Sequence, residues 1–423
     1  MTAAAATEPR SWFGQPAGLT ILFLTEMWEK FSFYGMRALL VYYMTKQLLI
    51  AQDNASLIYG FYTAFVYLTP IAGGVVSDRW LGRRRAVIIG GSVMALGHFM
   101  MTFEPLFYGA LACIALGNGL FLPSLPSQIG SLYAPEDPRR VRSYNIYYVG
   151  VNLGGFLAPL VCGTLGELYG WHYGFAAAGV GMLSGLAIYT LGRRHLPPEP
   201  PRVVKAMVQA ATRHERRQLF LLLAIIGCAV VVYRGAYEQV GNTVALWADA
   251  GVDRAVGSGF TIPMTWFQSL NPLLVFLLTP FLLAWWSKLA TRGREPMPLR
   301  KMAFGAGGLA ASYLMLALVA WLAHGPANWL WLLAFFVILT TAELFILPVG
   351  LGLFARLAPA GMAATTIAAW FLAAFAGNLL AGMLGTLWSR LSPNAFFLLI
   401  GAVAAVASLA LLLLSMRRLR ALD

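Results

Sequence analysis

The hydrophobic residues of this sequence are gathered into long runs, each about as long as the roughly 20 apolar residues that cross a bilayer as a helix. A polar stretch at 196–217 separates two groups of six runs. The pattern therefore predicts twelve spanning helices in two halves, 1–195 and 218–423, joined by a linker. The predicted spans are 18–48, 57–80, 86–103, 106–132, 142–166 and 172–195, followed by 218–248, 260–290, 299–323, 328–356, 361–390 and 393–416.

Most of the 30 Lys and Arg residues lie between these runs and on one side of the predicted membrane, whereas the other side carries only Lys46, Arg254 and Arg390. Cytoplasmic loops are the ones enriched in Lys and Arg. We therefore expect both termini and the 196–217 linker in the cytoplasm, which requires an even number of spans. The net charge of +13 then reflects topology and anionic headgroups rather than nucleic-acid binding. The basic regions are the N-terminus, the loops 79–85, 139–142, 193–217 and 288–301, Arg356, and the tail with Arg417, Arg418 and Arg420.

Composition excludes a soluble globular protein, because 59% of the residues are hydrophobic and 11% are charged, where soluble chains carry about 25% charge. The first 17 residues lack the features of a removable signal peptide, so the first run is expected to stay as a helix. No phosphate-binding G-x-x-x-x-G-K-S/T loop and no metal-ligand spacing of Cys or His occurs. We therefore expect no cofactor and no enzyme. A sensor with an output domain is an alternative that the short cytoplasmic segments disfavour.

Seven charged residues lie well inside the predicted spans, away from their ends, where an unpaired charge costs about 2.5–3.5 kcal/mol or more. Such residues must face a cavity or one another. Together they indicate a polar path through the protein, although a buried ion pair between two helices explains any single one equally well. The residues are Glu26, Glu29, Lys30, Arg37, Arg234, Glu238 and Glu343.

Two motifs carry a resemblance. GGVVSDRWLGRRR, residues 73–85, resembles the G-x-x-x-D-R-x-G-R-R loop of the major facilitator superfamily, with one extra residue before its second Gly. There, Asp78, Arg79 and Arg83 are expected to form a charge network that latches helix ends. EMWEKFSFYGMRALLVYYM, residues 26–44, resembles the first-helix signature E-x-x-E-R-F-x-Y-Y-G-M-R of the proton-coupled oligopeptide transporter family.

Further signatures of that family are matched in both halves and in the same order. The matching segments are YNIYYVGVNLGGFLAPLVCG (144–163), YEQVGNTV (237–244), SLNP (269–272), ELFILPVGL (343–351) and AWFLAAFAGNLLAG (369–382). The resemblance implies an all-α major facilitator fold that imports di- or tripeptides with protons by alternating access, driven by the proton gradient. We expect a monomer in a bacterial inner membrane, whose partners are the peptide, protons and lipid.

A peptide has two charged ends and a variable side chain, so a promiscuous site should bind the ends by charge and leave side chains to adaptable pockets. Arg37 can bind a carboxylate and Glu343 an ammonium group, and the resemblance gives these residues those roles. It also implies that Asn152 and Asn271 bond to the backbone or amino end. The implied pocket walls are Tyr34, Tyr67 and Trp370.

Proton coupling requires carboxylates whose protonation changes as the cavity opens and closes, because a carboxylate that loses water binds its proton more tightly. Glu26 and Glu29 lie three residues apart on nearly the same helix face, with Lys30 adjacent. The resemblance makes these three the coupling group and makes Glu238 a switching partner of Arg37. A static clasp between Glu238 and Arg37 is the alternative.

Three features depart from the family pattern. Lys30 stands where the signature has Arg, and Leu122, in GNGLFLPS, stands where the family has a helix-4 lysine. The linker is also too short to hold the two additional helices that are common between the halves of bacterial members.

Arg234 stands where the family usually has a tryptophan, four residues before Glu238 and therefore on the same helix face. We hypothesise that Arg234 replaces the cation lost at Leu122 and binds the substrate carboxylate. Alternatively, Arg234 only pairs with Glu238 and coupling is weakened. A related transporter of a modified peptide or another small anionic substrate is the second interpretation.

Overall fold

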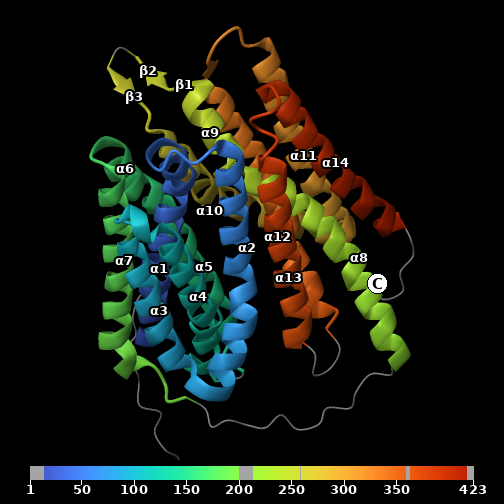
Figure 1. Cartoon of the computed structure of the whole chain (residues 1–423). Helices are drawn as coiled ribbons and strands as arrows, with labels where there is room; N and C mark the ends of the chain where they lie inside the picture. The colour runs from blue at the N-terminus through green and yellow to red at the C-terminus, as the bar shows by residue number, and fades with distance from the viewer. Residues whose placement is uncertain (1–13, 135, 200–212, 258, 359–362, 417–423) are drawn as a thin grey trace, which may run out of the picture. The chain divides into compact units, whose positions relative to one another are not determined.

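The computed structural model describes residues 14–134, 136–199, 213–257, 259–358 and 363–416 (Figure 1). The tail arginines 417, 418 and 420 and residues 200–212 of the predicted linker lie outside the described residues. The chain divides into two compact units. Unit 1 comprises Met1–Arg37 and Thr69–Val203, and unit 2 comprises Ala38–Leu68 and Val204–Asp423.

Long helices make up nearly all of both units, as the apolar runs predict. Unit 1 contains most of α1, the end of α2, and α3 to α7, whereas unit 2 contains the end of α1, most of α2, and α8 to α14. The first seven helices are α1 (Ala17–Tyr42), α2 (Gln52–Val76), α3 (Arg83–Met100), α4 (Phe107–Ser124), α5 (Arg139–Ala158), α6 (Thr164–Leu168) and α7 (Trp171–Gly192). The others are α8 (Arg213–Tyr237), α9 (Thr243–Ala250), α10 (Leu270–Ala290), α11 (Pro298–Leu322), α12 (Leu330–Arg356), α13 (Ala363–Gly385) and α14 (Pro393–Met416).

Ten helical segments of the described residues are long and apolar enough to cross a membrane. Two further long helices, α1 and α3, are not among these ten because they carry more charged residues. Glu26, Glu29, Lys30 and Arg37 lie in α1, and three arginines open α3. The membrane domain is thus confirmed, whereas the total of twelve spans stays a prediction.

Unit 1 is held together by close helix contacts. In this unit α3 lies beside both α4 and α7 (Figure 1). A Cβ added to Gly90 would lie 2.6 Å from the carbonyl oxygen of Gly117, so α3 and α4 approach at backbone distance. Small residues permit this approach in membrane helices.

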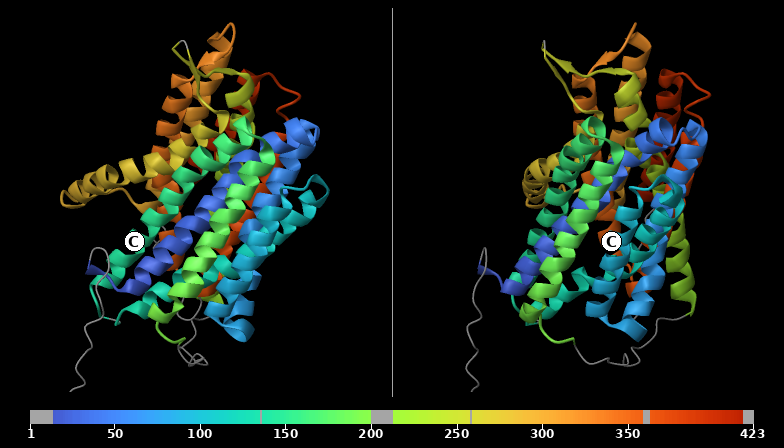
Figure 2. Two further views of the ribbon diagram at one scale, coloured as in Figure 1. Left: turned by 90° about the vertical axis from the view of Figure 1, so that its left-hand side faces the viewer. Right: turned by 60° about the vertical axis from the view of Figure 1, so that its left-hand side comes forward.

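In unit 2, α11 packs against α12 and α14, and α8 packs against α13 (Figure 1). These helices enclose an aromatic core that includes Phe335, Phe396 and Phe397, all fully buried. By contrast, α10 extends away from the other helices of this unit (Figure 2), and Val275 is its one buried residue.

Several predicted spans begin a few residues away from the observed helices, since α2 begins at Gln52 rather than 57, α8 at Arg213 rather than 218, and the helical segment of the eighth span at Met264 rather than 260. The eighth span was predicted to begin at residue 260, but Phe260 lies in a strand and α10 begins at Leu270. The apolar residues around Phe260 extend the hydrophobic run, whereas Pro263 and the glycines before it favour a turn. Four two-residue strands form two pairs, β1 with β4 in parallel and β2 with β3 in antiparallel. They are β1 (Val252–Asp253), β2 (Ala255–Val256), β3 (Phe260–Thr261) and β4 (Ala327–Asn328).

Candidate substrate and proton site

A cluster of one lysine and two carboxylates lies on α1 in unit 1. Lys30 Nζ lies 2.6 Å from Glu29 Oε2 and 3.4 Å from Glu26 Oε1. Glu29 is fully buried and Glu26 is 2% exposed. The predicted grouping of these three side chains is therefore observed. Because two carboxylates share one ammonium, the cluster as drawn carries one negative charge in excess, and a single added proton would neutralise it.

Glycines of α5 and α7 allow these helices to pack closely against α1 beside this cluster. A Cβ added to Gly150 of α5 would lie 3.0 Å from the carbonyl oxygen of Phe23, and one added to Gly185 of α7 would lie 3.1 Å from Trp28 Cβ. Both helices thus pack closely on the α1 backbone next to Glu26 and Glu29.

Three other predicted substrate residues belong to unit 1. Asn152 is buried on α5, and its Nδ2 donates to the carbonyl oxygen of Tyr148 at 2.9 Å. Tyr34 packs edge-on against Phe33, and Arg37 is half-buried on α1. Because Arg37 belongs to unit 1 and Glu238 to unit 2, the pairing of these two residues stays a prediction.

The loop motif forms a wide helical turn at Ser77–Leu81, followed by Gly82 with φ of +79°. Asp78 and Arg79 are exposed, and Arg83 donates to the Ser127 carbonyl oxygen at 3.1 Å. The proposed network among these three charges stays a prediction.

Arg84, which sequence reasoning did not single out, is hydrogen-bonded to residues 196–199. Its guanidinium donates to the carbonyl oxygens of Leu196 and Pro197, and its backbone N–H donates to Glu199 at 2.6 Å. A basic residue in a basic loop gives no sequence signal for such a role.

In unit 2, Arg234 and Glu238 form a buried ion pair one helical turn apart. Arg234 Nη1 lies 2.6 Å from Glu238 Oε1, and the side chains are 7% and 1% exposed. The guanidinium also lies 4.8 Å from the centre of the Tyr67 ring. Arg234 Nε has no hydrogen-bond partner among the described residues. The guanidinium thus retains a donor for a further acceptor.

Glu343 is held in the same unit by polar side chains of α8, α10 and α12. Asn271 Nδ2 donates to Glu343 Oε2 at 2.6 Å and to Thr340 Oγ1 at 3.1 Å. Tyr237 also hydrogen-bonds Glu343, which feels the charges of Arg234 and Glu238. Residues from three helices therefore form one polar cluster.

Trp370, predicted as a pocket wall, is 5% exposed and belongs to the aromatic core of unit 2. It packs edge-on against Phe354 at 5.3 Å, and a Cβ on Gly350 would collide with its ring. Leu122, at the position of the missing lysine, is half-buried on α4 of unit 1.

The helix that carries Glu238 is broken immediately after it. Residues 238–241 form a tighter turn, and Asn242 has φ of −114° and ψ of −92°. Ser56 donates to Asn242 Oδ1 at 3.0 Å, while Gln239 Nε2 donates to the carbonyl oxygen of Ala381 at 2.8 Å. These buried hydrogen bonds fix the break, which hydropathy alone does not reveal.

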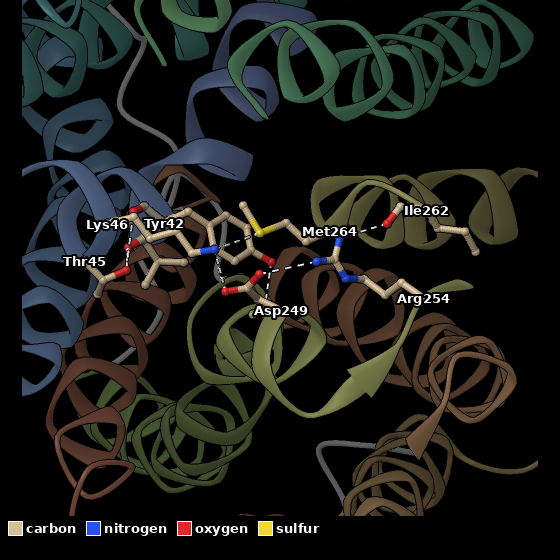
Figure 3. A network of polar contacts seen from close by, with 9 residues as sticks. Tyr42, Thr45, Lys46, Asp249, Arg254, Ile262 and Met264 are labelled. Atoms are coloured by element: carbon tan, nitrogen blue, oxygen red, sulfur yellow. Dashed lines mark hydrogen bonds and ion pairs between the residues drawn. The ribbon is translucent and has the colours of Figure 1, made fainter. Parts of the chain in front are cut away.

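Two of the three cations predicted on the non-cytoplasmic side meet at one carboxylate. Asp249, at the end of α9, lies 2.6 Å from Lys46 Nζ and 3.5 Å from Arg254 Nη2 (Figure 3). Arg254 also donates to the carbonyl oxygen of Ile262 at 2.9 Å. Nearby, the Tyr42 hydroxyl donates to the Ala245 carbonyl oxygen at 2.7 Å. The end of the first helix is thereby tied to α9 within unit 2.

No group of three or more His, Cys, Asp or Glu side chains suited to a metal ion occurs among the described residues. The polar clusters instead consist of carboxylates, basic groups, amides and hydroxyls. This chemistry can bind a charged organic molecule and exchange protons.

Comparison with known proteins agrees with the motifs. A model of the POT family matches residues 84–209 and 199–399. A di-/tripeptide transporter of Lactococcus lactis subsp. cremoris is 32% identical over 482 aligned positions, covering 96% of each chain, and a peptide transporter of Yersinia enterocolitica is 31% identical, covering 97% of this chain and 96% of the relative. A crystal structure of a POT peptide transporter in complex with sulfate superposes with a TM-score of 0.91 at 30% identity, covering 99% of this chain and 98% of the other. The chain therefore belongs to the POT family of membrane transporters, with the major facilitator fold and no enzyme among these relatives.

Proposed function

We propose that this chain is a symporter that imports di- and tripeptides together with protons. The observation that supports it most strongly is the buried set of Glu26, Glu29 and Lys30, which joins two carboxylates to one cation on the signature helix. Two relatives that are 32% and 31% identical to this chain are named a di-/tripeptide transporter and a peptide transporter. Burying a carboxylate with less than one full positive charge favours proton uptake, and returning it to water favours release.

The substrate is proposed to bind by its two charged ends. Arg37 and Arg234 supply positive charge for the carboxylate end, and Glu343 with Asn271 supplies acceptors for the amino end. Asn152, Tyr34, Tyr67 and Trp370 keep the supporting roles that the family signature implies. Arg234 is suited to its role because its guanidinium is buried, is held against Tyr67 and has an Nε–H without a hydrogen-bond partner among the described residues. Its close pairing with Glu238 equally supports the alternative of a static pair.

The movement is proposed to be alternating access between the halves 1–195 and 218–423, with the 196–217 linker and both termini in the cytoplasm. The two stretches matched by the family model overlap over residues 199–209 and leave no unmatched segment between the halves. The alignment with the Lactococcus lactis relative is 482 positions long, longer than this chain of 423 residues. Both observations support the absence of two helices between the halves. A monomer in a bacterial inner membrane remains the expected setting.

Uptake by purified protein in liposomes tests the proposal. Labelled dialanine should accumulate above its external concentration when the lumen is alkaline relative to the medium. It should only equilibrate when the pH is equal on both sides or a protonophore is present. Accumulation that ignores the proton gradient would refute coupling, and the absence of any dialanine uptake would refute the substrate.

A second candidate is a transporter of a modified peptide or another small anion, because this chain combines Leu122 with an additional buried arginine at position 234. Competition separates the two candidates. Unlabelled dipeptides should block uptake of labelled dialanine more strongly than small organic anions do. The reverse order would favour the second candidate.

A further inference from the structure

Asn271 and Thr340 lie around the carboxylate that is proposed to bind the amino end of the substrate. Thr340 and Glu343 are three residues apart on α12 and therefore share a helix face, and Asn271 faces both from α10. The Asn271 amide nitrogen has two hydrogens. One is donated to Glu343 and the other to Thr340, so this nitrogen has no hydrogen left for a substrate.

The orientation of the Asn271 amide follows from its partner. An ionised carboxylate can only accept hydrogen bonds. Turning the amide around would place its carbonyl oxygen 2.6 Å from Glu343 Oε2, where two acceptors would repel each other. The drawn orientation satisfies the contact and leaves Asn271 Oδ1 as the atom that can meet a substrate.

We propose that Thr340 is a positioning residue that acts through Asn271, so that Asn271 presents only its acceptor oxygen to the amino end of the substrate. Thr340 is fully buried, so its hydroxyl reaches the subsite through the Asn271 amide. By fixing that amide, Thr340 directs Nδ2 toward Glu343 and Oδ1 toward the substrate. This inference rests on the proposed function and assigns a role to a residue outside the signature positions considered above.

The chemistry of the subsite then selects a cation. The Glu343 carboxylate has about four lone-pair positions, so the bonds from Asn271 and Tyr237 leave room for an ammonium hydrogen. Asn271 Oδ1 can accept a second one. An acylated amino end offers a single N–H and a carbonyl oxygen, which finds no donor at Asn271.

Three variants of adjacent threonines provide the test. Thr340→Val keeps the shape and removes the hydroxyl, and Thr340→Ser keeps the hydroxyl. Thr341→Val makes the same change at an exposed residue whose hydroxyl donates to the Val337 carbonyl oxygen of its own helix. In liposomes, Thr340→Val should raise KM for dialanine about three- to tenfold, as expected for one neutral hydrogen bond, with the maximal rate unchanged. Thr340→Ser and Thr341→Val should stay near the wild-type KM.

A second measurement separates positioning from packing. In a Glu343→Gln background, Thr340→Val should raise the KM for dialanine by much less than it does in the wild type. In both backgrounds, Thr340→Val should change the inhibition of dialanine uptake by N-acetyl-dialanine only slightly. Equal KM values for Thr340→Val and Thr341→Val, or the same fold-change with and without Glu343, would overturn the inference. Thr340→Ala repeats the comparison if valine disturbs packing. Wild-type protein that takes up no dialanine would instead refute the proposed function.

Discussion

The pair formed by Arg234 and Glu238 allows the most quantitative prediction. The perturbation is Arg234→Met, which keeps most of the aliphatic stem and removes the guanidinium from beside Glu238. The two charged groups lie 2.6 Å apart and are 7% and 1% exposed, so neither is well solvated when its partner is removed. Breaking such a pair on one side typically destabilises a protein by about 3–5 kcal/mol, whereas replacing both partners by neutral groups is close to neutral.

The assay is thermal unfolding of the purified protein in detergent, on a double-mutant cycle. Arg234→Met should lower the free energy of unfolding by several kcal/mol, and adding Glu238→Gln should recover most of that loss. Arg254→Met is a matched control, because Arg254 and Asp249 are 3.5 Å apart and 19% and 22% exposed. More exposed pairs contribute about 0–1 kcal/mol, so this control should unfold close to the wild-type temperature.

Two results would refute the reasoning. One is an Arg234→Met shift no larger than that of Arg254→Met. The other is a double variant as unstable as Arg234→Met alone. Either result would mean that removing the Arg234 guanidinium does not leave a buried, uncompensated charge on Glu238. Two further variants report on substrate binding. Arg234→Ala should reduce dialanine uptake sharply, and Arg234→Trp combined with Leu122→Lys should restore it.

The remaining predictions concern coupling, substrate recognition and the non-cytoplasmic side. Glu29→Gln should abolish accumulation driven by a pH gradient but spare exchange of labelled dialanine at equal pH, and unimpaired accumulation would refute the assignment of Glu29. Glu343→Gln should lower affinity for dialanine by about ten- to a hundredfold, as expected when a charged hydrogen-bond partner is lost, with less effect on N-acetyl-dialanine; equal losses for both would contradict its role. Lys46→Met should lower the free energy of unfolding by about 1 kcal/mol or less, and the loss should be smaller in an Asp249→Asn background than in the wild type; equal losses in both would show that the pair in Figure 3 is not coupled.

The sequence predicts well whatever depends on local spacing. The first helix was expected over 18–48 and is observed as Ala17–Tyr42 followed by a wide turn to Gln47. The contacts of Lys30 with Glu26 and of Arg234 with Glu238 follow from residues four apart on a helix. The contact of Lys30 with the adjacent Glu29 does not follow from that spacing.

Features that depend on tertiary packing were not predictable. Thr340 is one of two adjacent threonines in an apolar run, and the approach of α10 to α12 gives it a polar side-chain partner. The break at Asn242 is fixed by Ser56, which lies 186 positions earlier in the chain. The start of α10 was misplaced because the apolar residues of a short strand are indistinguishable by hydropathy from the start of a span.

Substrate-driven proton movement tests the central claim most directly. Liposomes containing the purified transporter and a luminal pH indicator, with no initial pH difference, are given an inward gradient of dialanine. The account predicts acidification of the lumen by the wild type and none by Glu29→Gln, with labelled dialanine entering in both cases. Entry of dialanine into wild-type liposomes without any change in luminal pH would contradict it.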